Sequence, residues 1–80
     1  MEKYIELSQE EIKLGFVSSC VEFVAAELKT SYHDVYNRMK KVKMLKDYVY
    51  ACYDVLHCDS RENVTAELVD LLKRRESQLA

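Results

Sequence analysis

The segment Leu7-Ser8-Gln9-Glu10-Glu11-Ile12-Lys13-Leu14-Gly15-Phe16, which continues to Leu28, decides the fold. Ser8 followed three residues later by Glu11 is typical of a capping box, in which each side chain bonds the other residue's backbone N–H. Apolar residues then cover an arc of roughly 200°, which is wide for a surface helix: Ile12, Leu14, Phe16, Val17, Cys20, Val21, Phe23, Val24 and Leu28. We therefore predict a helix from Ser8 to about Lys29 at the centre of the domain.

The composition favours one small all-helical domain. The chain has 80 residues, no proline and one glycine, whereas β-sandwiches and barrels need many turns built from those residues. A hydrophobic content of 49% with a net charge of −2 argues against disorder. We predict a single domain over residues 1–80, with an ordered core of about 8–75. Its fold would be an all-α, small irregular bundle of about four helices around the central N-terminal helix.

Three further helices are expected after the first. The second follows a Ser31 cap and runs from about Tyr32 to Val42, the third spans about Leu45 to His57, and the fourth runs from Asp59 or Ser60 to about Arg75. Helical periodicity predicts which side chains point inward. They are Tyr32, Val35, Tyr36, Met39 and Val42; Leu45, Val49, Cys52 and Leu56; and Val64, Leu68, Leu71 and Leu72.

Several functional classes lack their sequence signals. The three cysteines show no CxxC spacing, and no second cluster joins Cys52, His57 and Cys58 to complete a zinc site. His57 and Cys58 are adjacent, and adjacent helical side chains do not face each other. No Gly-rich loop, signal peptide or long apolar run is present. We expect a cytoplasmic protein with no metal, no cofactor, no membrane contact and no catalytic activity.

One constellation suggests binding. On the third helix, Tyr50, Tyr53, Asp54 and His57 lie together beside the apolar stripe, as i,i+3 and i,i+4 neighbours. They form either an internal hydrogen-bonded network or an exposed protein-binding patch, since tyrosines with fixed polar neighbours are good interface anchors. Either way we expect them, with Glu22 nearby, to form or support the contact surface for a protein partner.

Two other surfaces give alternatives. A basic segment carries no acidic residue and could contact nucleic acid, although lysines at a helix end are also commonly solvated; it comprises Arg38, Lys40, Lys41, Lys43 and Lys46. On the first helix, a face of mostly small residues could be a solvent face or the contact of a homodimer; it comprises Gly15, Ser18, Ser19, Glu22 and Ala26.

The chain resembles a known family. Tyr53-Asp54-Val55-Leu56-His57 is similar to the Tyr-Asp-x-Leu-His signature of domain-of-unknown-function family 3791, a family of short bacterial helical proteins. Phe16 to Glu22 and Ser31 to Val35 also resemble it, and the likeness covers roughly residues 12–72. The family often has threonine where this chain has Cys58.

The resemblance implies a small helical protein without an assigned activity. Members are often encoded beside, or fused to, ADP-ribosyltransferase-like proteins, as in toxin–antitoxin pairs. It therefore favours a protein–protein interaction module that is antitoxin-like over a nucleic-acid-binding regulator.

Overall fold

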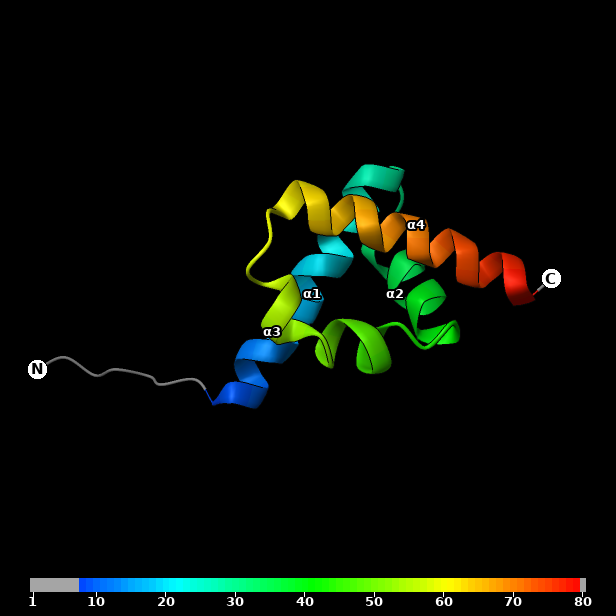
Figure 1. Ribbon diagram of the computed structural model, residues 1–80. Helices are drawn as coiled ribbons and strands as arrows, with labels where there is room; N and C mark the ends of the chain where they lie inside the picture. Colours follow the sequence, from blue (N-terminus) through cyan, green and yellow to red (C-terminus); the bar gives the residue numbers. More distant parts are fainter. Residues whose placement is uncertain (1–7, 80) are drawn as a thin grey trace, which may run out of the picture.

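The computed structural model describes residues 8–79, all of whose regular elements are helical, as predicted (Figure 1). In chain order these are α1 (Gln9–Leu28), α2 (Tyr32–Lys41), the π-helix η1 (Leu45–Tyr50), α3 (Tyr53–Leu56) and α4 (Arg61–Leu79). Residues 1–7 and 80 of the predicted domain lie outside the described residues.

The predicted start of α1 is confirmed. The Glu11 N–H donates to Ser8 Oγ at 3.1 Å, and the Ser8 N–H donates to Glu11 Oε1 at 2.9 Å. The helix ends at Lys29, which takes the left-handed conformation with φ of 56°. This conformation lets the Thr30 N–H bond the Ala25 carbonyl oxygen at 3.0 Å, so a backbone group of the last turn is satisfied.

Helix α1 is central, as its wide apolar arc indicated. It packs against α2, η1 and α4, and it supplies four buried side chains, Cys20, Val21, Val24 and Ala25. Figure 1 shows α2 and α4 beside its second half and the segment from η1 to α3 beside its first half. The other buried hydrophobic residues are Val35, Met39, Val42, Met44, Val49, Leu56, Val64, Leu68 and Leu72.

The prediction of one continuous third helix from Leu45 to His57 is wrong, because this segment forms two short elements, η1 and α3. Met44 and Val49 are both fully buried. Five residues apart, they would diverge by about 140° on an α-helix, whereas the wider π-turn brings them closer to one side. The Val49 N–H donates to the Met44 carbonyl oxygen at 2.8 Å, an i→i+5 bond. A turn at Ala51 and Cys52 then separates η1 from α3.

Helix α4 starts where it was predicted and ends later. The Asn63 N–H donates to Ser60 Oγ at 3.1 Å, so Ser60 caps the helix. The helix continues to Leu79, beyond the expected end at Arg75. Its outer half is tied to the rest of the fold, because Arg75 Nη1 donates to the Val42 carbonyl oxygen at 3.0 Å.

The burial of several side chains differs from the one expected. Tyr32 and Tyr36 were predicted to point inward but are 40% and 36% exposed, and Leu14 is 54% exposed. Met44 was not predicted as a core residue but is fully buried. A Cβ added to Gly15 would meet no atom within 4 Å, so this glycine serves no close packing within the chain.

Candidate functional site

The predicted binding patch is centred on α3, which has only four residues and anchors itself to the core through Leu56. We call the outward side of this element the α3 surface; it comprises Tyr53, Asp54, Val55 and His57. Val55 is 74% exposed, Asp54 and His57 are exposed, and Tyr53 is half-buried. The short helix therefore presents an uncovered aliphatic side chain together with a carboxylate and an imidazole.

The aromatic part of the α3 surface is held in a fixed geometry. The Tyr53 and His57 rings are stacked with their centroids 4.3 Å apart and their planes 3° from parallel. Phe16 of α1 meets the Tyr53 ring edge-on at 5.2 Å. His57 Nδ1 lies 2.7 Å from the Tyr53 carbonyl oxygen. Because that oxygen can only accept, Nδ1 carries the proton, and in the neutral ring Nε2 is left as an acceptor.

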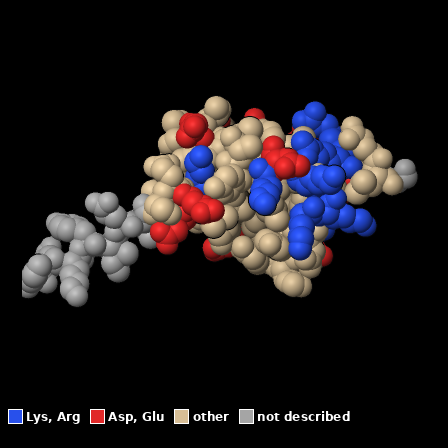
Figure 2. All heavy atoms as spheres, turned by 90° about the horizontal axis from the view of Figure 1, so that it is seen from below, with Lys and Arg blue, Asp and Glu red and all other residues tan. Residues whose placement is uncertain are grey.

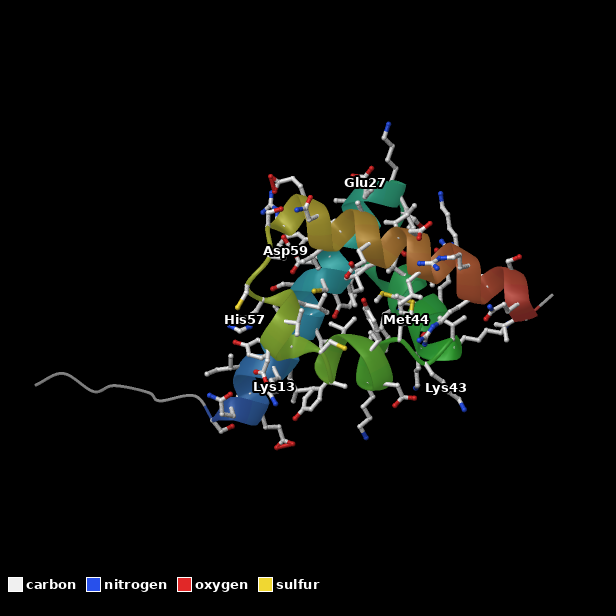
Figure 3. The ribbon with its side chains drawn as sticks, in the orientation of Figure 1. Lys13, Glu27, Lys43, Met44, His57 and Asp59 are labelled. Atoms are coloured by element: carbon white, nitrogen blue, oxygen red, sulfur yellow. The ribbon has the colours of Figure 1, made fainter. Side chains whose placement is uncertain are left out.

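The five predicted site residues do not form one network. Within residues 8–79, no hydrogen bond joins the Asp54 carboxylate to Tyr50 or His57. Tyr50 lies on η1, and its ring faces the Lys13 ammonium group at 5.6 Å from the ring centroid. Figure 3 labels Lys13 and His57, which lie on different elements. Glu22 is exposed on α1 and has no hydrogen bond or ion pair to the other four within this range. Tyr53 and His57 are thus the pair that the fold brings together.

His57 and Cys58 do meet, contrary to the expectation from helix geometry. The two residues lie just past the last α3 residue, and Cys58 Sγ is 3.8 Å from His57 Nε2. The thiol also donates to the Asp54 carbonyl oxygen at 3.4 Å. Both side chains are exposed. The thiol therefore lies beside the exposed imidazole and adds a polarisable group next to the α3 surface.

A second feature, which the sequence did not reveal, is a groove between α1, α2 and η1. We call it the tyrosine groove; its volume is about 680 Å³. Its apolar and aromatic lining comprises Leu14, Val17, Tyr32, Tyr36, Leu45 and Tyr50, and its charged lining comprises Glu10, Lys40, Lys43, Lys46 and Asp47. The Tyr32 and Tyr36 rings stack with centroids 6.2 Å apart, and the Tyr32 hydroxyl hydrogen-bonds Ser18 Oγ at 3.1 Å. The wall of the groove is thus pre-organised.

The predicted basic segment is a real surface cluster with one exception. Lys40, Lys41, Lys43 and Lys46 are exposed. Figure 2 shows Lys and Arg gathered over the side of the molecule where the chain ends. Arg38 is instead held by Glu76, with Nε and Nη2 at 2.8 Å and 2.7 Å from the carboxylate oxygens. The Arg38 guanidinium is therefore already hydrogen-bonded to a carboxylate of the same chain.

Another hollow, of about 590 Å³, lies between α1 and α4. There the Arg61 guanidinium covers the Phe23 ring at 4.5 Å from the ring centroid, and Glu27 lies on the rim. An exposed cation over an aromatic ring contributes about 0.5–1 kcal/mol. This contact helps to pack the start of α4 against α1.

Two kinds of site have no counterpart in the part of the chain that the structure describes. Over residues 8–79, no three His, Cys, Asp or Glu side chains are grouped so that they could hold a metal ion. Over the same residues, every helix is too short or too polar to cross a bilayer.

The comparisons with known proteins give one match. A family described as "Protein of unknown function (DUF3791)" matches residues 15–75, which is more than half of the chain. No curated protein matches, and no solved structure matches.

Proposed function

The chain belongs to the DUF3791 family of proteins of unknown function, and from its surface we propose that it is a protein–protein interaction module that binds its partner through α3. The observation that supports this is the uncovered Val55, 74% exposed, on the same short helix as the stacked Tyr53–His57 pair. A large aliphatic side chain placed in water gains free energy when a partner covers it, and a fixed aromatic pair nearby on the helix can anchor the same partner.

The polar groups of the α3 surface would give this contact its specificity. Asp54 presents a carboxylate, and His57 Nδ1 is held by the Tyr53 carbonyl oxygen, so Nε2 is the ring nitrogen left for a partner. A matching partner would offer an apolar pocket for Val55, flanked by hydrogen-bond donors. Because the Tyr53 and His57 rings are already stacked, less rotamer entropy would be lost on binding.

The family resemblance suggests which partner to test first. We propose that the module acts as an antitoxin-like partner of an ADP-ribosyltransferase-like protein. The direct test is calorimetry with a purified ADP-ribosyltransferase-like protein from the same organism. We expect a one-to-one complex, weakened at least about tenfold by Val55→Asp or by the double variant Asp54→Ala/His57→Ala, which is a loss of about 1.4 kcal/mol.

A matched control is available in this chain. Leu79 is 57% exposed at the end of α4, so Leu79→Asp adds the same charge to an exposed aliphatic position away from α3. It should bind like wild type. If Val55→Asp binds as tightly as wild type while its circular dichroism is unchanged, the α3 surface is not the contact. If no complex forms at all, the proposed partner is wrong.

The second candidate function is nucleic-acid binding by the basic segment, which is favoured by the exposure of Lys40, Lys41, Lys43 and Lys46. The tyrosine groove adjoins three of these lysines, and tyrosine rings can stack on unpaired bases. Binding of single-stranded DNA should then fall steeply with salt and be lost in Lys40→Glu/Lys41→Glu. Binding that ignores both changes would exclude this function.

A further inference from the structure

The tyrosine groove is an uncovered apolar area away from α3. Of the five large hydrophobic side chains exposed within residues 8–79, Leu14, Tyr32 and Tyr36 lie on it. Val17 and Leu45 also line the groove and are half-buried. Tyrosine-rich apolar surfaces of this kind are typical of the centres of protein interfaces. A molecule that binds in this groove would therefore have to contact tyrosine rings and aliphatic side chains at the same time.

The charges on this face have opposite signs at its two ends. Lys40, Lys43 and Lys46 lie at the junction of α2 and η1 and outnumber Asp47, which lies beside them on η1, whereas Glu10 lies in the first turn of α1. Figure 2 shows the same separation over the whole view, with most Asp and Glu on the side where α1 begins and most Lys and Arg on the side of the C-terminus. A partner with charges of one sign would be attracted at one end and repelled at the other.

We propose that the tyrosine groove binds the same groove of a second copy of this chain, with the two copies related by a two-fold axis. A two-fold interface joins the same patch on both chains, so each end of one groove faces the opposite end of the other. Glu10 of each copy then faces the lysine end of its partner, twice per dimer. The net charge of −2 per chain opposes association only weakly.

The helix that carries part of the groove also permits a close approach. Gly15 follows Leu14 on α1, and a Cβ at this position would point into open space. A glycine inside a helix costs on the order of 1 kcal/mol relative to alanine, and the single chain gains no packing in return. At the edge of a two-fold contact, the absent side chain would let a neighbouring helix come nearer.

The first measurement is the mass of the purified full chain by sedimentation equilibrium, from micromolar concentration to roughly 0.5 mM, which detects complexes as weak as about 1 mM. We expect a monomer–dimer equilibrium that weakens when the salt is raised from about 0.05 M to about 0.5 M, because the end-to-end charge pairs are exposed. Leu14→Asp should make the chain monomeric. A wild-type chain that stays monomeric up to the highest concentration would overturn the proposal.

A charge exchange tests the antiparallel arrangement itself. Lys43→Glu and Glu10→Lys should each raise the dimer dissociation constant by about tenfold, because each places like charges together at both ends of its own dimer. When the two variants are mixed, both ends of the mixed dimer again join opposite charges. The mixed dimer should therefore form with nearly the wild-type affinity. Failure of the mixture to recover would exclude this pairing.

Matched controls come from α4. Glu62, like Glu10, is a glutamate in the first turn of its helix, and Lys73 is an exposed lysine outside the groove. Glu62→Lys and Lys73→Glu should dimerise like wild type at the same net charge as the test variants. A dimer that these controls disrupt as strongly, or that Leu14→Asp leaves intact, would lie on another surface and would overturn the proposal. The α3 surface is not involved, so the result is independent of the partner proposed above.

Discussion

Arg38 on α2 holds the Glu76 carboxylate on α4 with two hydrogen bonds, from Nε at 2.8 Å and from Nη2 at 2.7 Å. The two residues are 38 positions apart in the sequence. Each side chain keeps about a third of its surface in water, 33% for Arg38 and 31% for Glu76. This two-pronged pair fixes the outer half of α4 against the end of α2, where Arg75 adds its bond to the Val42 carbonyl.

Glu76→Gln should destabilise the fold at neutral pH but not in acid. The hydrogen bonds from Arg38 lower the pKa of Glu76 below its ordinary value of 4.5. The stabilisation is therefore present above that value and is lost as the pH falls through the lower pKa of the folded state. We expect a loss of about 1 kcal/mol at pH 7 for this partly solvated pair, measured by urea unfolding, and a smaller difference from wild type at about pH 3.

The exposed pair Arg74–Asp70 gives the control for that comparison. Both of its side chains are 67% exposed, and Arg74 Nη2 lies 2.8 Å from Asp70 Oδ2. Asp70→Asn should cost at most about 0.5 kcal/mol at pH 7, because an exposed i,i+4 pair contributes little. Equal losses in the two variants would show that the geometry around Glu76 adds nothing.

Ser8→Ala should weaken α1 at its start. The Ser8 hydroxyl accepts the Glu11 N–H at 3.1 Å, and removing an N-cap oxygen costs about 1 kcal/mol. Thermal unfolding followed by circular dichroism measures the loss. Ser77→Ala, an exposed serine near the end of α4, should change the midpoint little. An unchanged midpoint in Ser8→Ala would mean that the capping box does not support the fold.

Leu56→Ala and Val55→Ala should have very different effects on stability, because the two side chains lie on the buried and the exposed side of α3. Leu56 is 4% exposed and Val55 is 74% exposed. The first substitution leaves a cavity and should cost roughly 2–5 kcal/mol, which is a large part of the stability of a domain this small. The second should stay within about 0.5 kcal/mol of wild type. Similar losses in both variants would contradict the orientation of α3.

The features of this fold that could be predicted from the sequence are those set by residues close together in the chain. The Ser8 capping box, the broad apolar arc of α1 and the Ser60 cap depend on residues within a few positions of each other, so they were predicted. The break between η1 and α3 could not be predicted in this way. The sequence from Leu45 to Leu56 has good α-helical periodicity, and the π-turn arises because Met44 and Val49 must both reach the core.

The candidate site was only partly predictable for the same reason. The Tyr53–His57 pair was found because i,i+4 neighbours meet on a helix. The tyrosine groove was not found, because it joins residues of α1, α2 and η1 that only the tertiary fold brings together. Periodicity placed Tyr32 and Tyr36 on the inward side of α2, yet the core there is filled by Val35 and Met39. A tyrosine also tolerates a half-exposed position, since its hydroxyl can remain in water.

Gly15→Ala should stabilise the folded chain by about 0.5–1 kcal/mol. Alanine restricts the unfolded chain and favours a helix, and its Cβ would meet no atom within 4 Å. The unfolding should be measured at micromolar concentration, where the monomer dominates. Ala26, also exposed on α1, gives the reverse control, because Ala26→Gly should cost a similar amount. A loss of stability in Gly15→Ala would mean that the space beside this residue is occupied.

Burial of Cys20 should make the fold sensitive to alkaline pH. This thiol is 2% exposed, and burial raises its pKa from 9.0 to about 11. Between these values the unfolded chain loses the Cys20 proton while the folded chain keeps it, so the free energy of unfolding falls as the pH rises. Two pKa units correspond to at most about 2.7 kcal/mol. Urea unfolding from pH 8 to pH 11 should therefore show a decline that is smaller in Cys20→Ala.

The thiols themselves provide an independent check of the same burial. Cys58 is exposed, Cys52 is half-buried and Cys20 is buried. Ellman's reagent at pH 8 should therefore modify Cys58 first and should reach Cys20 only when the chain unfolds, because the reacting species is an accessible thiolate. The variant Cys58→Ala should remove the fast phase and leave the alkaline decline of stability as in wild type. Rapid modification of Cys20 in the folded chain would contradict its place in the core beside Val21 and Val24.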